Sequence, residues 1–129
     1  MDNIASQLYD AAQLIVKNSY SPYSKFPVGA AILLDDGSIY SGCNIENASF
    51  SLTMCAEAVA IAKAIDKKIF TITHALVLAP KMPFCPPCGA CRQRLLEFST
   101  PNTIIYLSDT DTNIQSHKLS VLIPASFSL

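Results

Sequence analysis

The sequence has no tryptophan, little charge and no run of basic residues. Only 15% of its 129 residues are charged, half are hydrophobic, and the formal net charge is -1. Proteins that bind nucleic acid normally carry clustered positive charge, so this balance argues against a nucleic-acid partner and favours a small, weakly charged ligand. The scarcity of charge also suggests that another subunit covers part of an apolar surface.

The sequence also lacks a stretch long and apolar enough to span a membrane, and its first residues lack the pattern of an export signal. We therefore expect a cytoplasmic protein without a membrane partner. An odd number of cysteines, five, then favours metal binding or thiol chemistry over a disulfide framework. The length predicts a single domain, residues 1–129, which is short for an enzyme that must enclose a ligand.

Hydrophobic periodicity predicts an α/β fold with a sheet of four or five strands, of which the later ones are parallel. A β-hairpin is expected where two apolar runs flank Asp35, Asp36 and Gly37. The helix after Ser51 is apolar on almost every side, which predicts that it is buried. The predicted helices are 3–18 (capped by Asp2), 52–65 and 89–98, and the predicted strands include 28–34, 70–78 and 103–107. A further strand begins at 39–40 and runs out into a polar loop that starts at Cys43, and a short last element is 119–123.

Two segments with cysteines carry the candidate chemistry. Cys55 stands two residues before Glu57, and Cys88 and Cys91 open another apolar segment after two prolines. Residues three apart on a helix share a face, so Cys88 and Cys91 can bind one ion, and the positive end of a helix favours the thiolate. Three thiolates leave the fourth position of zinc open for water, and a carboxylate that is not a ligand can move protons.

The other cysteines leave alternatives open. Cys43 is expected to be a small core residue, because isolated cysteines are usually buried. Cys85 and Cys88 form a second C-x-x-C pair, so an iron-sulfur cluster or a dithiol redox pair is an alternative. Cys85 could also be the fourth ligand of a purely structural zinc site in a binding protein. Glu57 favours the open site, because a structural site has no use for that carboxylate.

Three longer segments resemble a known family. Residues 23–31, 42–49 and 87–93 are similar, in this order, to the opening, ribose-binding and second zinc segments of the homotetrameric, three-cysteine cytidine deaminases. The metal-site pattern is the one known for zinc deaminases, so it is matched here rather than derived. The resemblance covers nearly the whole chain. It implies a cytidine deaminase-like three-layer α/β/α fold, with a mixed sheet of about five strands and an N-terminal hairpin.

The resemblance also implies a reaction and the residues that perform it. Cytidine and deoxycytidine would be hydrolysed to uridine and deoxyuridine in pyrimidine salvage, by a homotetramer with one Zn²⁺ per chain. The implied ligands are Cys55, Cys88 and Cys91, with Glu57 as the catalytic proton shuttle. The implied substrate contacts are Phe26 on the base, Asn44 and Glu46 on the ribose hydroxyls, the Ala56 backbone on the base edge, and Phe50 and Phe127 from neighbouring subunits. Simpler alternatives are core packing for each aromatic and a turn-holding role for Asn44.

One position departs from the family pattern. Relatives have an arginine that hydrogen-bonds the ligand thiolates where this chain has Ala58. Three thiolates and a hydroxide leave Zn²⁺ with a net charge of about -2, so loss of the arginine should weaken the acidity of bound water unless Arg92, Arg94 or the helix N-termini compensate. Blasticidin-S deaminases also have an apolar residue here, so a blasticidin-like compound or a modified cytosine nucleoside is an alternative substrate. A tRNA or single-stranded nucleic-acid deaminase is disfavoured by the charge.

Overall fold

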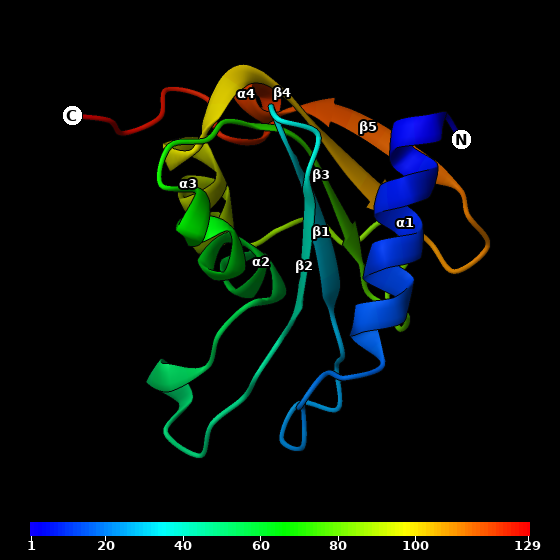
Figure 1. Ribbon diagram of the computed structural model, residues 1–129. Helices are drawn as coiled ribbons and strands as arrows, with labels where there is room; N and C mark the ends of the chain where they lie inside the picture. Colours follow the sequence, from blue (N-terminus) through cyan, green and yellow to red (C-terminus); the bar gives the residue numbers. More distant parts are fainter.

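Helices and strands alternate after an N-terminal hairpin, as the hydrophobic pattern predicts (Figure 1). The structure is a computed structural model, and it describes residues 1–129. Asp2 caps the first helix as expected, because its Oδ1 accepts a hydrogen bond from the Ala5 amide at 2.7 Å. The elements are α1 (Asn3–Val16), β1 (Gly29–Leu34), β2 (Ile39–Cys43), η1 (Phe50–Leu52), α2 (Ala56–Ala64), η2 (Ile65–Lys67), β3 (Ile72–Leu78), α3 (Gly89–Glu97), β4 (Ser99–Ser108), β5 (Ile114–Lys118) and α4 (Leu119–Leu122).

The five strands form one mixed sheet in the order β2-β1-β3-β4-β5. β1 pairs antiparallel with both β2 and β3, and β3 pairs parallel with β4. The expectation that the later strands are parallel is therefore right for β3 and β4. β5 was not predicted, and it pairs antiparallel with β4. The short last element expected at 119–123 is the helix α4.

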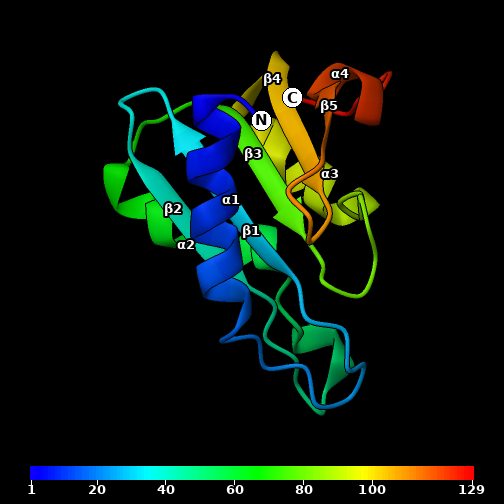
Figure 2. The same cartoon turned by 90° about the vertical axis from the view of Figure 1, so that its right-hand side faces the viewer.

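The two faces of the sheet are covered by different helices, which gives the expected three layers (Figure 2). Neighbouring residues of a strand point to opposite faces, so each central strand supplies both cores. Val77 of β3 packs with α2, α3 and α4, whereas Leu76 packs with α1. The first core contains Ile32, Leu34, Ala60, Ile61, Ala64, Ile72, Ala75, Val77, Leu95, Ile105, Leu107 and Leu119. The second contains Ala5, Leu8, Tyr9, Ala12, Val16, Ala31, Leu76, Leu78 and Tyr106.

Helix α2 lies directly on β2, and Gly42 permits the close contact. A Cβ atom on Gly42 would lie 2.6 Å from the Ala56 carbonyl oxygen and 2.5 Å from the Ala60 nitrogen. Only glycine allows the two backbones to approach this closely. The expectation that this helix is buried holds for the face that carries Ala56, Ala60, Ile61 and Ala64. It is wrong for the opposite face, because Ala62 is exposed and Ile65, just after α2, is 51% exposed.

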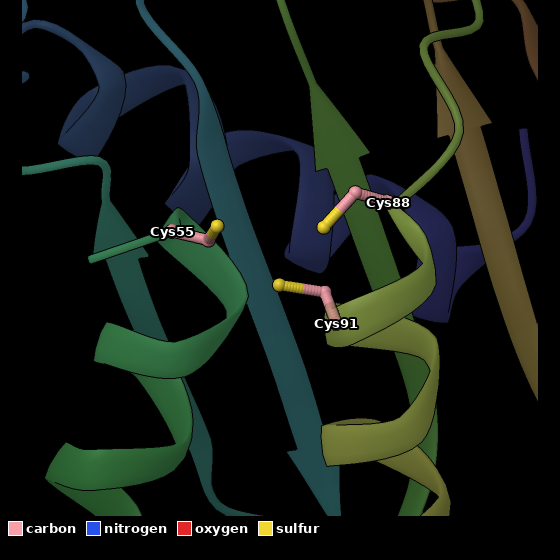
Figure 3. Close-up of side chains that lie close together, drawn as sticks. All are labelled: Cys55, Cys88 and Cys91. Atoms are coloured by element: carbon pink, nitrogen blue, oxygen red, sulfur yellow. The ribbon is translucent and has the colours of Figure 1, made fainter. Parts of the chain in front are cut away.

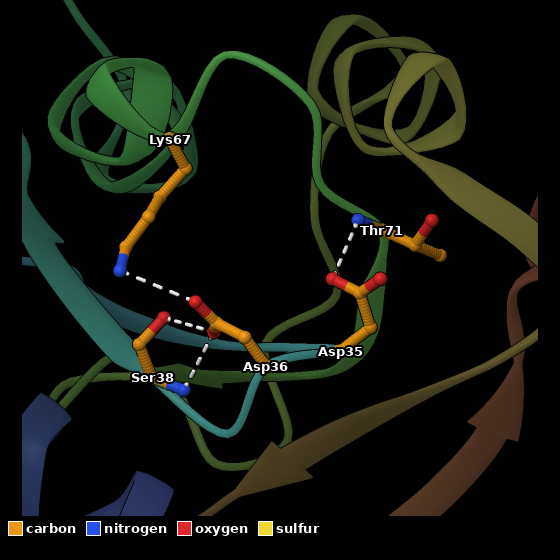
Figure 4. Close-up of polar contacts among 5 residues, drawn as sticks. All are labelled: Asp35, Asp36, Ser38, Lys67 and Thr71. Carbon is orange, nitrogen blue, oxygen red and sulfur yellow. Dashed lines mark hydrogen bonds and ion pairs between the residues drawn. The ribbon is translucent and has the colours of Figure 1, made fainter.

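The turn between β1 and β2 ties the hairpin to the segment that follows α2 (Figure 4). The Asp36 carboxylate accepts hydrogen bonds from the Ser38 hydroxyl and amide, at 2.5 and 2.9 Å, and pairs with Lys67 at 3.2 Å. Asp35 accepts from the Thr71 amide at 3.1 Å. Gly37 has a φ of 87°, which glycine adopts without strain. These contacts hold the expected tight turn in place.

Two loops form a projecting arm beside α2, composed of residues 20–28 and 45–54. An isolated β-bridge between Tyr20 and Ile45 joins the two segments, and a second one between Ile45 and Met54 closes the base of the second loop. Both views place the arm beyond the lower end of the sheet (Figures 1 and 2). The arm therefore lies at the end of β2 from which the chain leads into the first cysteine segment.

Candidate active site and metal centre

The three predicted ligand sulfurs converge between the first turns of α2 and α3 (Figure 3). The Sγ atoms of Cys55, Cys88 and Cys91 all lie within 4.8 Å of one another. Thiolates around a tetrahedral zinc ion lie about 3.8 Å apart, so this cluster fits one such ion after a small contraction. Cys85 is not part of the cluster, and Cys43 is buried as the core residue that was expected.

The start of each helix explains how the sequence builds this cluster. Cys55 and Cys88 are the N-cap residues of α2 and α3, and neither makes a side-chain capping hydrogen bond. The first N–H groups of both helices therefore lack a capping side chain, and their partial positive charge favours thiolates nearby. Cys91 lies one turn after Cys88, so both sulfurs face the same side of α3.

The thiols of the cluster share hydrogen bonds that favour ionisation of Cys55. A hydrogen bond from Cys91, assisted by Cys88 and by the positive charge of Arg94, outweighs burial and lowers the pKa of Cys55 to about 6. The same bond, with burial and the Glu57 charge, raises the pKa of the Cys91 thiol. A thiolate is the form that binds a metal, so the cluster is prepared for a cation.

Glu57 is a buried acid beside this cluster. It lies in the first turn of α2, is only 5% exposed, and has no cation paired with it, because Lys67 and Asp36 form the one ion pair of the chain. Burial raises the pKa of its carboxyl, and the Cys55 charge adds to the rise. A carboxyl with a raised pKa can both accept and return a proton near neutral pH.

A hollow opens onto Glu57 and the metal cluster, and a second hollow adjoins it at Thr53. Ten residues line the first: Val28, Asn44, Thr53, Cys55, Ala56, Glu57, Val77, Cys85, Pro86 and Cys88. The second lies in the projecting arm and is lined by Tyr23, Ser24, Glu46, Phe50 and Thr53. The structure therefore places Asn44, Ala56 and Glu57 at one hollow, and Glu46 and Phe50 at the next.

Asn44 is largely occupied by the fold, which agrees with the turn-holding alternative for it. Its Oδ1 accepts from the Ser19 hydroxyl at 2.5 Å and from the Val28 amide at 3.0 Å, and its Nδ2 donates to the Phe26 carbonyl at 2.8 Å. A side-chain amide has two N–H donors and two acceptor positions, so one donor remains free. Asn44 can therefore hold the arm and still donate one hydrogen bond into the hollow.

Glu46 offers a free hydrogen-bond acceptor, whereas Asn44 offers a free donor. Its carboxylate accepts hydrogen bonds from the Tyr23 amide at 2.9 Å, the Ser24 amide at 3.1 Å and the Ser24 hydroxyl. The Ser24 hydroxyl is the main cause that holds the pKa of Glu46 below its ordinary value. A carboxylate offers about four acceptor positions, so one is still free.

The three aromatic candidates lie apart from one another. Phe26 is half-buried and does not line either hollow, although its carbonyl helps to hold Asn44. Phe50 is 73% exposed on the arm, with its ring 5.7 Å from the Tyr23 ring in an edge-on arrangement. Phe127 is 70% exposed near the C-terminus and borders neither hollow of its own chain. Neither Phe50 nor Phe127 is a core residue of this chain.

Sequence reasoning missed several residues of the site. Val28, Thr53 and Val77 line the main hollow, yet the two valines belong to apolar runs that predict only buried strands. Their register in the sheet, which local sequence does not specify, brings them to the hollow. Arg94, by contrast, was named with Arg92 and the helix N-termini as a candidate to replace the missing arginine, and its Nη1 lies 3.6 Å from Cys91 Sγ.

Comparison with known proteins identifies the family. The family model for the cytidine and deoxycytidylate deaminase zinc-binding region matches residues 2–107. The chain belongs to this deaminase family. It is 43% identical over 112 residues to a cytidine deaminase of Sporosarcina psychrophila, a match that covers 87% of this chain and 82% of the relative. A cytidine deaminase of Halalkalibacterium halodurans is also 43% identical, over 111 residues that cover 86% of this chain and 84% of the relative.

Solved structures of this deaminase family have the same fold. The crystal structure of a cytidine deaminase from Burkholderia pseudomallei matches with a TM-score of 0.89 and 32% identity, covering 98% of this chain and all of the other. The resemblance found in the sequence is therefore confirmed, together with the α/β fold. The family is zinc-binding, and the cluster of Cys55, Cys88 and Cys91 could hold one such ion.

No helix meets the length and hydrophobicity needed to cross a membrane.

Proposed function

We propose that this chain hydrolyses cytidine and deoxycytidine to uridine and deoxyuridine, in pyrimidine salvage. The observation that carries the proposal is the hollow shared by an unpaired, buried Glu57 and the three-cysteine cluster. Membership of the deaminase family supports the reaction class. The near-neutral charge supports a free nucleoside rather than a nucleic acid as the substrate.

In this proposal Cys55, Cys88 and Cys91 bind one zinc ion per chain. Zinc at such a site is a Lewis acid that makes water a nucleophile at neutral pH. Glu57 takes a proton from the attacking water and delivers it to ring N3, which makes C4 more electrophilic. The hydroxide that remains adds to C4, and Glu57 carries the proton of the new hydroxyl group to the amino nitrogen. The bond from C4 to that nitrogen then breaks, the C4 carbonyl forms, and ammonia leaves. Burial of Glu57, which is only 5% exposed, supports this shuttle role.

The nucleoside is placed by groups that flank the hollow. The free Asn44 donor and the free Glu46 acceptor suit ribose hydroxyls, each of which can accept and donate. The Ala56 amide at the start of α2 has no capping side chain and is available to the edge of the base. Phe26 would contact the base only after a movement of the arm, because it does not line the hollow here.

We further propose that the enzyme is a homotetramer in the cytoplasm. The arm exposes Tyr23, Ile45, Phe50, Leu52 and Met54, and Phe127 is exposed elsewhere. Exposed apolar patches of this kind normally meet a partner, and in this proposal neighbouring subunits close each hollow with Phe50 and Phe127. All five cysteines are free, which suits a reducing compartment. Sedimentation analysis should give four times the chain mass; a monomer that is fully active would contradict the subunit contribution.

Ala58 suggests a second class of substrate. The residue is apolar where relatives have arginine, so a modified cytosine nucleoside or a blasticidin-like compound is the competing substrate. The deciding experiment follows the absorbance of cytidine, deoxycytidine and blasticidin S with purified protein and measured zinc. Loss of the cytidine spectrum is the expected result. Turnover of blasticidin S alone would transfer the proposal to that class, and zinc without any turnover would favour a structural site.

A further inference from the structure

Arg94 is the only cation whose side chain contacts the cysteine cluster. Its Nη1 donates to Cys91 Sγ at 3.6 Å. The arginine lies one turn after Cys91 on α3, so the two side chains share a face of the helix. No carboxylate competes for this guanidinium, because the single ion pair of the chain joins Lys67 and Asp36. The charge of Arg94 is therefore directed at the sulfur.

Arg92, the other arginine of α3, is committed elsewhere. Its Nε donates to the Pro87 carbonyl at 2.8 Å, and its Nη1 donates to the Leu122 carbonyl at 2.7 Å. These bonds join the start of α3 to the end of α4. Arg92 donates no hydrogen bond to a cysteine sulfur. Arg92 is thus a structural clamp, and it does not neutralise the cluster.

A cluster of three thiolates needs such a cation. Three thiolates and one divalent ion sum to a net charge of -1, and the helix N-termini offer only partial charges of about +0.5 each. On α2, the position one turn after ligand Cys55 is Ala58, whose methyl group carries no charge. On α3, the position one turn after ligand Cys91 is Arg94. Ala58 and Arg94 thus each lie one turn after a ligand cysteine, Ala58 after an N-cap and Arg94 further into its helix, and only α3 carries a cation there.

We propose that Arg94 is a positioning residue that neutralises the zinc-binding cysteines from α3 and replaces the charge that Ala58 does not supply from α2. The inference rests on the proposed function, because it concerns the same metal site. Arg94 does not line the hollow, so it acts on the ligands and not on the substrate. Its removal should therefore lower zinc retention and kcat and leave KM unchanged.

The test compares zinc-loaded wild type with Arg94→Gln, Arg94→Lys and the double variant Ala58→Arg with Arg94→Gln. Zinc release is followed with a chromogenic chelator, and kcat and KM are measured on cytidine. Arg94→Gln should weaken zinc retention and lower kcat, each by about 10- to 100-fold, as expected when a partner of a metal ligand is lost. Arg94→Lys should lose less, and the double variant should recover most of both. Lys63→Gln, which removes an exposed cation at the far end of α2, is the matched control and should match wild type.

Each result decides the proposal. Wild-type zinc retention in Arg94→Gln would overturn it. Loss in Arg94→Gln that neither Arg94→Lys nor the double variant relieves would mean that the side chain acts by packing, which also overturns it. Substitution of cobalt for zinc gives a further readout, because an electron-richer thiolate in Arg94→Gln should move the sulfur-to-cobalt absorption band to longer wavelength. Zinc retention decides the matter even if cytidine proves not to be a substrate, so the two proposals can fail separately.

Discussion

Gly42→Ala tests whether the contact between β2 and α2 positions the metal site. The new methyl group would lie 2.6 Å from the Ala56 carbonyl oxygen and 2.5 Å from the Ala60 nitrogen, and both atoms are backbone. An ordinary contact needs 3.4 Å, so α2 must move by about 0.9 Å to relieve the shorter contact. Ala56 directly follows Cys55, so the ligand sulfur moves with the helix. Zinc sites tolerate errors of only about 0.2 Å in ligand distance, so zinc binding should suffer with stability.

Overpacking of this kind typically costs about 1 to 3 kcal/mol of unfolding free energy. For a chain of this length that corresponds to a fall in Tm of roughly 4 to 12 °C. Thermal unfolding by circular dichroism and zinc content per chain would be measured at one protein concentration and one zinc concentration. Gly89→Ala is the matched control, because a Cβ atom there meets nothing within 4 Å. If Gly42→Ala kept the wild-type Tm and zinc content, the argument from close approach would be refuted.

Two further predictions concern the hairpin turn and the cysteine outside the cluster. Hydrogen bonds from Ser38, with help from Lys67, lower the pKa of Asp36 to about 2 from its usual 3.8, so this stabilisation is complete above about pH 4 and disappears as the pH falls through 2. Asp36→Asn should therefore have a lower Tm than wild type at pH 6, with a smaller difference at pH 3; a difference that grew on acidification would contradict the sign. Cys85→Ser should retain one zinc per chain, because Cys85 lies outside the ligand cluster. Zinc loss in that variant would instead point to a closed, four-cysteine site.

The sequence predicts the pairing of Cys88 and Cys91 from local geometry, because their spacing places both on one face of a helix. Cys55 lies on another helix, and its place in the cluster was predicted from the known pattern of zinc deaminases. The capping role of Asp2 is also local. Continuous apolar runs identify the central strands, because each supplies both cores.

Features that depend on long-range packing could not be predicted in this way. β5 is an edge strand, and its five residues contain only one apolar side chain, Ile114, so no hydrophobic signal marks it. Which arginine contacts the cysteine cluster also depends on tertiary structure, because Arg92 and Arg94 both lie within one turn of Cys91. Arg92 is turned away by the Leu122 carbonyl, thirty residues further along the chain. The Asn44 hydrogen bonds likewise need Ser19 and Val28, which are distant in the sequence, to lie beside the end of β2.

The most direct test of the account is turnover of cytidine by the zinc-loaded protein beside its Glu57→Gln variant. The account predicts one zinc per chain in both proteins, because Glu57 is not a ligand. It predicts loss of the cytidine absorbance with wild type and a rate about 100- to 10,000-fold lower in the variant, the range for removal of a general acid and base. Equal rates in the two proteins, or bound zinc with no wild-type turnover, would contradict a site in which Glu57 moves protons beside an open metal position.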